Sequence, residues 1–280
     1  MMDFSLFLRE NLPSVNSFHP HFNEAIAHIL NAGGKHFRAK LYLGVVEIYA
    51  PDLLDRAQII ALAIELMHSY SLIHDDLPAF DNAALRRGVA TLHEKYDEVT
   101  AVLVADAFNT HSFLLISRSE FEAELKVRLI ECLAQNAGLS GMVIGQALDC
   151  FFENKTLDLE QLSFIHTHKT AKLIAACMKM GAITAKLSQS EALKLYDIGI
   201  LLGLIFQIHD DILDASKDSK ELGKPAQNDA CKNSYVNLMG LEQAREHKKL
   251  KQDELTALLE AQNPQLKALL LKLSEKYLKD

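Results

Sequence analysis

The sequence has few of the residues that interrupt helices. Among 280 residues there are only 12 glycines and 6 prolines, and because both weaken helix interiors, their scarcity predicts long helices. No stretch alternates apolar and polar residues over the length of a strand, and no Asn-Gly pair is present that would close a hairpin. The sequence therefore predicts an all-α fold. It predicts a single domain over residues 1–280, since no linker separates two cores.

Other scarcities exclude whole classes of protein. The four cysteines (Cys132, Cys150, Cys177 and Cys231) include no CxxC pair, which indicates reduced thiols of a cytoplasmic protein rather than a disulfide framework. No apolar run approaches the roughly 18 residues of a membrane span, and no basic segment precedes an apolar one at the N-terminus. We therefore expect neither membrane insertion nor a signal peptide. The formal net charge of −8 argues against nucleic-acid binding, which relies on basic surfaces.

What the sequence has instead is helical periodicity along most of its length. Residues 59–66 are apolar on almost every side, which predicts a buried helix. Residues 215–234 form a polar, basic stretch whose length is typical of a functional or disordered loop, and the remaining tail has the pattern of amphipathic surface helices. The helices expected before that loop cover 3–12, 21–30, a segment ending before Pro51, 55–77, 99–116, 123–132, 139–152, 159–187 and 190–214.

Three carboxylates and two guanidinium groups lie in one short segment directly after the apolar helix: Asp75, Asp76, Asp81, Arg86 and Arg87. Carboxylate oxygens suit Mg²⁺, which binds proteins through one or two carboxylates together with water and substrate phosphates. Arginine matches phosphate oxygens bidentately. The segment therefore predicts a metal-bridged phosphate site. Pro78 must bend or end the helix for Asp81 to join the other two carboxylates.

A second acidic cluster follows another apolar run far downstream, at Asp210, Asp211 and Asp214. Spacings of three and four residues put these carboxylates on one helix face, where exposed like charges repel by a few tenths of a kcal/mol, or about 0.2–0.5, per pair. A helix C-terminus would add to that cost, and a bound cation would remove it. A solvated acidic helix end is the alternative for either cluster alone. Because each cluster follows an apolar helix, each is expected at the mouth of a core.

The two clusters and their surroundings resemble one known family. Residues 75–81, followed by 85–88, resemble the first aspartate-rich motif of short-chain trans-polyprenyl diphosphate synthases, in the form with a Pro-containing insertion that bacterial farnesyl diphosphate synthases have. Residues 206–214 resemble the second motif. The remaining matches follow in the family's order from about Gly33 to Arg245: Gly33-Gly34-Lys35 with Arg38, His68, Gly145-Gln146 with Asp149, Lys169-Thr170, Leu222-Gly223-Lys224, Asp229, and Lys232 with Tyr235.

This resemblance implies an isoprenoid-synthase-type helical bundle in which the two motifs face each other across a deep apolar cavity. It implies metal ligation by Asp75, Asp76, Asp81, Asp210, Asp211 and Asp214, with Mg²⁺ as the cofactor and Mn²⁺ as a possible substitute. It assigns the allylic diphosphate to Arg86, Lys169 and Lys224. It assigns isopentenyl diphosphate to Lys35, Arg38, His68 and Arg87. It places Lys169, Thr170 and Gln207 at the reacting centre.

The implied reaction is the condensation of isopentenyl diphosphate with dimethylallyl or geranyl diphosphate. Diphosphate leaves only if its developing charge is neutralised, which metal ions and cationic side chains accomplish. The allylic cation then needs a dry cavity, so that isopentenyl diphosphate rather than water attacks it. The apolar helices would supply that cavity. The released diphosphate is the expected proton acceptor, since the apolar segments contain no candidate base.

Product length is expected to depend on Tyr70 and Ser71. In the family, the residue five positions before the first Asp of the first motif helps to form the floor of the chain pocket. A bulky Tyr70 there predicts a short product, the fifteen-carbon farnesyl diphosphate, and Ser71 one turn before Asp75 does not oppose this. The twenty-carbon geranylgeranyl diphosphate is the alternative product.

The sequence departs from the family pattern where His36 replaces Arg, Ala39 replaces Pro, Asn82 replaces Asp and Ala171 replaces Gly. The loss of Arg at position 36 could weaken the isopentenyl site, although Lys35 and Arg38 remain. None of these changes removes a carboxylate of the predicted metal site. Activity is therefore expected.

Three other interpretations remain open at this point. A helical metal phosphohydrolase would need His28 or His36 as a further ligand and leaves Arg86 and Arg87 unexplained. A regulatory subunit of the same fold would normally have lost its aspartates. A terpene cyclase would not need the isopentenyl site. The family also suggests a homodimer, with residues 99–116 and 123–133 as interface candidates.

Overall fold

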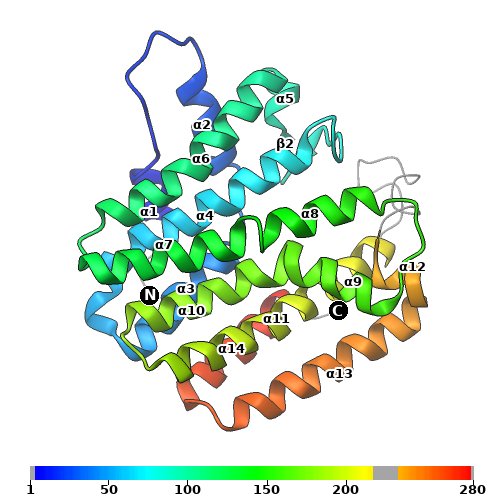
Figure 1. Ribbon diagram of the computed structural model, residues 1–280. Helices are drawn as coiled ribbons and strands as arrows, with labels where there is room; N and C mark the ends of the chain where they lie inside the picture. Colours follow the sequence, from blue (N-terminus) through cyan, green and yellow to red (C-terminus); the bar gives the residue numbers. More distant parts are fainter. Residues whose placement is uncertain (1–3, 217–232, 279–280) are drawn as a thin grey trace. The chain divides into compact units, whose positions relative to one another are not determined.

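The computed structural model describes residues 4–216 and 233–278. Within these ranges the regular secondary structure is almost entirely helical, which confirms the predicted fold class (Figure 1). Lys224, Cys231, Lys232 and most of the predicted loop 215–234 lie outside the described residues. The helices are α1 (Phe4–Glu10), α2 (Phe22–Asn31), α3 (Phe37–Tyr49), η1 (Pro51–Leu53), α4 (Leu54–Asp76), α5 (Leu92–Lys95), α6 (Glu98–Arg118), α7 (Ala123–Ala137), α8 (Met142–Phe151), α9 (Leu159–His166), η2 (Thr167–Ala171), α10 (Lys172–Thr184), α11 (Gln189–Ser216), α12 (Tyr235–Met239), α13 (Leu241–Glu260) and α14 (Pro264–Tyr277).

The contacts of the chain group it into two compact units. The first unit comprises residues 1–43 and 52–130, and the second comprises 44–51 and 131–280. Helices α3 and α7 each contribute residues to both units. The first acidic cluster therefore belongs to one unit and the second cluster to the other.

The core of the first unit is built on α4 and α6, which pack side by side (Figure 1). The predicted all-round apolar segment is buried: Ile60, Leu62, Ile64 and Leu66 have no accessible surface. Because α4 is enclosed in this way, its C-terminal end is held in a defined position. That end carries Asp75 and Asp76.

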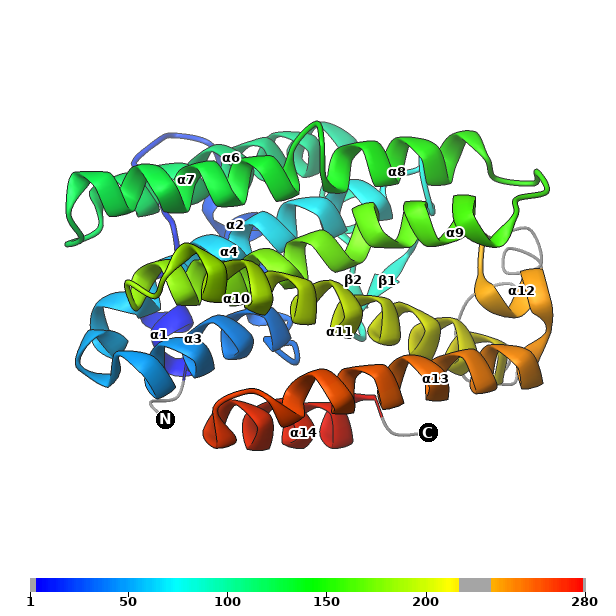
Figure 2. The ribbon, with the colours of Figure 1, turned by 60° about the horizontal axis from the view of Figure 1, so that its bottom comes forward.

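A small hairpin corrects the expectation that the chain has no strand. Strands β1 (Leu85–Arg86) and β2 (Val89–Ala90) pair antiparallel, with Arg86 opposite Val89 (Figure 2). The two residues between them, Arg87 and Gly88, both have positive φ angles of 56° and 80°. This is the backbone of a two-residue hairpin turn, which usually shows as Asn-Gly. With Arg in place of Asn, the sequence signal was missing.

The second unit is organised around α11, which packs against α10 and α13 (Figure 2). Two glycines of α11 allow α10 and its preceding turn to come close, because a side chain at Gly199 or Gly203 would collide with the backbone of Ala175 or Ala171. Ala171 is the position where the family usually has Gly. Here it is fully buried, and Gly203 leaves the space for its methyl group.

The helix expected over 159–187 is continuous but irregular. It begins at Leu159 with a capping box from Asp158 and Gln161, and it contains a π-helical turn, η2, over Thr167–Ala171. Such turns hold one extra residue per turn and are frequent at functional sites. Lys169 and Thr170 lie inside it.

Two of the described helices, α6 and α11, are long and apolar enough to cross a membrane by length and composition alone. The expectation that no apolar run approaches this length does not hold on this measure. Core helices of soluble proteins meet the same criterion, and about half of the apolar window of α11 (56%) is buried inside the protein.

Candidate active site

The first aspartate cluster forms where α4 ends. The helix stops at Asp76, two residues before Pro78, as the sequence predicted. The chain then folds back on itself, and the backbone N–H of Asp81 donates to the carbonyl of Asp75 at 2.9 Å. Asn82 follows with a φ of 47°, a left-handed conformation that Asn tolerates well. This turn brings Asp81 back to the helix end that carries Asp75.

Arg86 is paired with Asp76. Its Nε and Nη2 atoms both donate to Oδ1 of Asp76, at 2.9 and 2.5 Å. Asp76 is only 2% exposed. Although burial lowers the pKa of Arg86, the hydrogen bond and charge of Asp76 raise it above its ordinary value overall. The pair fixes the guanidinium beside the first cluster, where it was predicted to bind a diphosphate.

Arg87, at the tip of the hairpin turn, contacts the loop that precedes α3. Its Nη1 atom donates to the carbonyl of Gly33. Gly34 leaves the necessary room, because a Cβ there would lie 2.9 Å from Cζ of Arg87. The glycine pair and the arginine, 54 positions apart in the sequence, therefore hold the predicted isopentenyl residues Lys35 and Arg87 in one region of the first unit.

His68 lies beneath these cations and is neutral. Nη1 of Arg38 donates to its Nε2 atom at 3.1 Å, so its proton is on Nδ1, a buried atom with no hydrogen-bond partner among the described residues. Burial, followed by the charges of Arg38, Arg87 and Arg86, holds the pKa of His68 well below its ordinary value. The positive charges that keep this histidine neutral would also attract a bound anion. The structure thus brings together Arg38, His68 and Arg87, three of the four predicted isopentenyl residues.

His36, one of the departures from the family pattern, faces the protein interior. Its Nδ1 atom donates to the carboxylate of Glu65 at 3.1 Å, and both side chains are buried. The other carboxylate oxygen of Glu65 accepts from the backbone N–H of Ala39 at 3.1 Å. Glu65 therefore anchors the start of α3, the segment that carries Arg38. The replacement of Arg by His supplies a partner for this buried acid.

Tyr70 lies on α4 with its side chain 8% exposed. Its ring meets that of His74 edge to face, with centroids 5.4 Å apart. Burial raises the pKa of Tyr70, and a hydrogen bond with the side chain of Asn109 on α6 lowers it in part. The ring is therefore held from two helices. Ser71, the second predicted chain-length residue, donates to the carbonyl of His68 at 2.9 Å.

The second aspartate cluster occupies the C-terminal turns of α11, as the sequence predicted. Asp214 is exposed and Asp210 is half-buried, but Asp211 is buried, with 9% of its surface exposed. One carboxylate oxygen of Asp211 accepts from the backbone N–H of Tyr235 at 2.8 Å. Burial, together with the neighbouring charges of Asp210 and Asp214, raises the pKa of Asp211 to about 7.

Three side chains of the second unit form a hydrogen-bonded row. Thr170 donates to Oε1 of Gln207 at 2.8 Å, and Nε2 of Gln207 donates to the other oxygen of Asp211 at 2.9 Å. The half-buried amide of Gln207 thus has a partner on both sides. The row links two predicted reacting-centre residues to the second aspartate cluster.

Lys169, the third predicted reacting-centre residue, is paired with Asp149 of α8. Its Nζ atom donates to Oδ2 of Asp149 at 2.6 Å. Gly145, one turn earlier on α8, lies directly against the backbone of Lys169, and a Cβ there would collide with it. The close approach of α8 and the π-turn therefore depends on this glycine. It also places Asp149 within reach of the lysine.

No group of three or more His, Cys, Asp or Glu side chains converges as a preformed metal centre within residues 4–216 and 233–278. The donor set still fits Mg²⁺, because this ion commonly takes only one or two carboxylates and completes its octahedron with water and substrate phosphate. Asp75 and Asp81, held at one helix end by the Asp81–Asp75 backbone bond, offer such hard oxygen donors. Assignment of the individual aspartates to metal ions stays a prediction.

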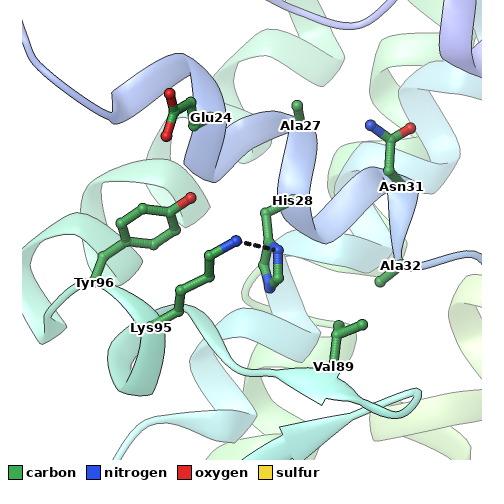
Figure 3. Close-up of a pocket in the computed structure, with 8 residues that line it drawn as sticks. All are labelled: Glu24, Ala27, His28, Asn31, Ala32, Val89, Lys95 and Tyr96. Atoms are coloured by element: carbon green, nitrogen blue, oxygen red, sulfur yellow. Dashed lines mark hydrogen bonds between the residues drawn. The ribbon is translucent and has the colours of Figure 1, made fainter.

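The first unit also contains an open pocket of about 450 Å³ that includes none of the predicted residues (Figure 3). In it, Nζ of Lys95 donates to Nδ1 of His28 at 3.0 Å. The other ring nitrogen of His28 donates to the carbonyl of Ala90 at 2.8 Å. His28, which a phosphohydrolase would have used as a ligand, is therefore engaged with β2 and α5. The remaining lining residues are Glu24, Ala27, Asn31, Ala32, Val89 and Tyr96.

Sequence reasoning missed the supporting residues of both units. Glu65, Asn109 and Asn233 each hold a predicted residue or its neighbour, and none belongs to a recognisable motif. One signal was available for Glu65, since an acid within an otherwise apolar helix must find a partner if it is buried. For the two asparagines there was no signal, because their partners are distant in the sequence.

Comparisons with known proteins agree with this geometry. The sequence profile of the polyprenyl synthetase family matches residues 19–273 of the chain. The chain belongs to the polyprenyl synthetase family. This confirms the predicted family and the prenyltransferase reaction.

Several named members of this family are similar in sequence to the chain over most of its length. A farnesyl diphosphate synthase of Micrococcus luteus is 40% identical over 264 residues, which cover 92% of this chain and 89% of that protein. A chloroplastic geranylgeranyl pyrophosphate synthase of Arabidopsis thaliana is also 40% identical, over 88% of this chain and 68% of its own. A Helicobacter pylori geranyltransferase, solved with magnesium and isoprenyl diphosphate, superposes with a TM-score of 0.91 at 44% identity. That match covers 98% of this chain and 93% of the other.

Proposed function

We propose that this polyprenyl synthetase is a farnesyl diphosphate synthase. It joins isopentenyl diphosphate to dimethylallyl diphosphate and then to geranyl diphosphate, and it stops at fifteen carbons. Relatives with fifteen-carbon and twenty-carbon product names are equally similar in sequence, so identity alone does not choose between them. The observation that carries the choice is the ring of Tyr70.

A chain-length boundary must be a bulky side chain that cannot move aside. Tyr70 meets this requirement, because it is buried on α4, packed edge to face against His74 and hydrogen-bonded to Asn109. It lies five residues before Asp75, between one and two helical turns from the predicted diphosphate end. A growing chain that starts at this end would meet the ring early.

We assign isopentenyl diphosphate to the cationic group of the first unit. Arg38 and Arg87 would bind its phosphates, together with Lys35 in the loop before α3. His68 supports this assignment because it is kept neutral and accepts a hydrogen bond from Arg38, which leaves the guanidinium fixed in orientation. No metal is needed at such a site, since guanidinium groups match phosphate oxygens directly.

We assign the allylic diphosphate to Arg86, Lys169 and Lys224, of which Lys224 lies outside the described residues. Arg86 is held by Asp76 and Lys169 by Asp149, so both cations are oriented before any substrate arrives. Preorganised charge of this kind stabilises the negative charge that develops on a leaving group. Thr170 and Gln207 would line the reacting centre.

Asp75, Asp76, Asp81, Asp210, Asp211 and Asp214 are proposed to hold Mg²⁺, directly or through water, and Mn²⁺ is proposed as a substitute. The bound ion would supply charge neutralisation at the leaving diphosphate. The structural neighbour solved with magnesium and isoprenyl diphosphate supports this cofactor. Among these residues Asp211 has both oxygens engaged by Gln207 and Tyr235, which favours an indirect role for it.

We also propose that the protein is a cytoplasmic homodimer. None of the three described cysteines, Cys132, Cys150 and Cys177, forms a disulfide, which supports a reducing compartment. Apolar side chains of α6 and α7 are exposed in the single chain, among them Leu103 and Val127 at 50% and 63%. An apolar surface of this kind is suited to a second copy.

The test is incubation of the purified protein with labelled isopentenyl diphosphate and geranyl diphosphate, with Mg²⁺, with Mn²⁺ and with a chelator. The expected result is a fifteen-carbon diphosphate in either metal and no product with the chelator. A mainly twenty-carbon product would establish a geranylgeranyl diphosphate synthase instead. Release of phosphate without chain growth would support the phosphohydrolase interpretation.

A further inference from the structure

Asn233, just before α12, has no role in the motifs or in the reaction described above. Its side-chain amide donates two hydrogen bonds to one residue, Asp149 of α8, although the two are 84 positions apart in the sequence. One bond goes to the carboxylate oxygen Oδ1 at 3.1 Å and the other to the backbone carbonyl at 3.0 Å. Because both contacts are made by the same amide, the side chain of Asp149 is fixed relative to its own backbone.

The other carboxylate oxygen of Asp149 binds Lys169. Nζ of Lys169 donates to Oδ2 at 2.6 Å, so the carboxylate is held by a neutral donor on one side and by the ammonium on the other. A lysine side chain is flexible and has many rotamers. Its ammonium is confined only if the carboxylate that receives it is itself confined. Asn233 supplies that confinement.

Asn233 is in turn held from the helix that carries Lys169. Nε2 of His166 donates to the backbone carbonyl of Asn233 at 3.0 Å, and His166 lies three residues before Lys169. Burial lowers the pKa of His166 to about 4, so the histidine is neutral and donates from Nε2. Together with the backbone from His166 to Lys169, these contacts form a closed circuit of four residues: Asn233, Asp149, Lys169 and His166.

The charge of this circuit is consistent with its geometry. Burial raises the pKa of Asp149, but the charge and hydrogen bond of Lys169 and the hydrogen bond of Asn233 lower it below its ordinary value overall. Asp149 is therefore a carboxylate at neutral pH. Asn233 fixes it without adding a second charge, so Lys169 remains the cation of the group.

We infer that Asn233 is a positioning residue for the prenyl transfer reaction: it orients Asp149, which holds the Lys169 ammonium toward the allylic diphosphate. The inference rests on the proposed function, because it uses the role assigned to Lys169. Asn233 itself touches no substrate.

The test compares Asn233→Ala with the wild-type enzyme, using geranyl diphosphate, isopentenyl diphosphate and Mg²⁺. A misplaced charged group typically costs one to two orders of magnitude, so kcat/KM for geranyl diphosphate should fall about tenfold or more. The KM for isopentenyl diphosphate should change less than twofold, since its proposed residues are elsewhere. Asn233→Asp keeps the size but removes both donors, and it should be at least as impaired as Asn233→Ala.

A double-mutant cycle shows whether the effect passes through Lys169. In a Lys169→Ala background, Asn233→Ala should reduce the remaining activity by less than about twofold, because residues acting in one network are not additive. Binding of inorganic diphosphate with Mg²⁺, measured by calorimetry, gives a readout that needs no turnover. Diphosphate binding should be weaker in Asn233→Ala than in the wild type. It should be no weaker in the double variant than in Lys169→Ala alone.

Ser234→Ala is the matched control. Ser234 caps α12 by accepting from the backbone N–H of Asn237 at 3.1 Å, so its hydroxyl is engaged with α12 rather than with Asp149. It should lower the melting temperature of the protein as much as Asn233→Ala while leaving kcat/KM for geranyl diphosphate within about twofold.

The inference is overturned if Asn233→Ala leaves kcat/KM and diphosphate binding at wild-type values. It is also overturned if its effect adds fully to that of Lys169→Ala, or if Ser234→Ala impairs the enzyme equally. Failure of the proposed function is a different result, in which the wild-type protein makes no prenyl product. In that case the calorimetric cycle still decides whether Asn233 acts through Lys169.

Discussion

A single buried acid, Glu65, determines the conformation of the segment that carries Arg38. Burial by itself raises the pKa of its carboxyl group. The hydrogen bond and charge of His36, the N–H of Ala39 and the charge of Arg38 together lower that pKa below its ordinary value of 4.5. Because the folded-state pKa is lower than the unfolded one, Glu65 stabilises the fold above pH 4.5. This contribution is lost as the pH falls through the folded-state pKa.

Replacing Glu65 by Gln should reduce the free energy of unfolding at pH 7 by about 1–3 kcal/mol, the usual cost of spoiling a buried charged hydrogen-bond network. The difference from the wild type should shrink as the pH falls below 4.5, because the unfolded chain then takes up a proton at Glu65 while the folded protein still holds the carboxylate. Urea unfolding at pH 7 and at a series of pH values below 4.5 measures both effects. Glu131→Gln, at an exposed position of α7, is the control and should change stability by less than about 0.5 kcal/mol. A difference that stays constant with pH would contradict the explanation.

The ring of Tyr70 should set product length. Tyr70→Ala removes the buried ring and should shift the main product from fifteen to twenty carbons, measured by chromatography of the dephosphorylated products. The change should also lower stability, because truncating a buried aromatic residue typically costs about 3–5 kcal/mol. Assays should therefore be made below the melting temperature of the variant.

Tyr70→Phe is the matched control for this change. It keeps the ring and its contact with His74 and removes only the hydroxyl that bonds Asn109. It should still give a fifteen-carbon product. If both variants made the twenty-carbon product, or if neither did, the ring of Tyr70 would not be the boundary that limits chain length.

Functional residues that lie close together in the sequence could be predicted. Residues that act through contacts with distant parts of the chain could not. The sequence predicts a cation site at Asp75, Asp76 and Asp81 because their carboxylates occur together. It does not predict the pairing of Asn233 with Asp149, since this contact exists only after α8 and the segment before α12 have come together. Asp76 shows an intermediate case: its type was predictive, but its pairing with Arg86 was not.

At the level of the helices, the π-turn η2 is the element on which the second unit's chemistry depends. It presents Lys169 and Thr170, and it packs against α8 at Gly145. Gly145→Ala would force the backbone of Lys169 to move, and overpacking of this kind typically costs about 1–3 kcal/mol. We expect a lower melting temperature together with a fall in kcat of at least about tenfold, because small displacements of a catalytic group are costly.

The control for this helix is Ala147→Ser, at an exposed position two residues further along α8. It should leave both the melting temperature and kcat near wild-type values. If Gly145→Ala also left kcat unchanged, the close approach of α8 would not be what positions Lys169.

Helix boundaries were largely predictable from apolar periodicity and proline. The sequence places the end of α4 at the Pro78 insertion and the end of α3 before Pro51, and both hold in the structure. The π-turn was not predictable, because an extra residue in a turn leaves the local composition helical. The hairpin was missed because its turn uses Arg87 in a left-handed conformation, which is uncommon for a residue other than Gly, Asn or Asp.

At the scale of the whole molecule, the exposed apolar residues of α6 and α7 predict association. Val99, Leu103 and Val127 are 67%, 50% and 63% exposed in the single chain. Burying such side chains against a second copy would contribute about 25 cal/mol for each Å² of apolar area removed from water. Light scattering coupled to size exclusion should give twice the chain mass of 31.3 kDa.

A charged residue in this surface should disrupt the dimer. We expect Leu103→Glu combined with Val127→Glu to give a monomer at micromolar concentration, because an unpaired charge at the centre of an interface is strongly unfavourable. Leu250→Glu on α13, where the leucine is 66% exposed, is the control and should remain dimeric. Dimerisation of the double variant, or monomerisation of the control, would place the interface elsewhere.

The π-turn η2 also absorbs its extra residue without changing the relative rotation of the two helices that it joins. Each residue of an α-helix turns the chain by about 100°, but a π-turn spreads one more residue over a single turn. Helices α9 and α10 therefore present the same faces as a regular helix one residue shorter would. Inserting a further residue between Thr167 and Ala171 as an ordinary helical step would rotate α9 by about 100° against α10. The apolar side of α9, with Leu162 and Ile165 in the core beside Tyr235, would then face away from it. Such an insertion should retain the far-ultraviolet helical signal and lose the cooperative melting transition. The polyprenyl synthetase chain therefore tolerates substitution in this turn more readily than an insertion.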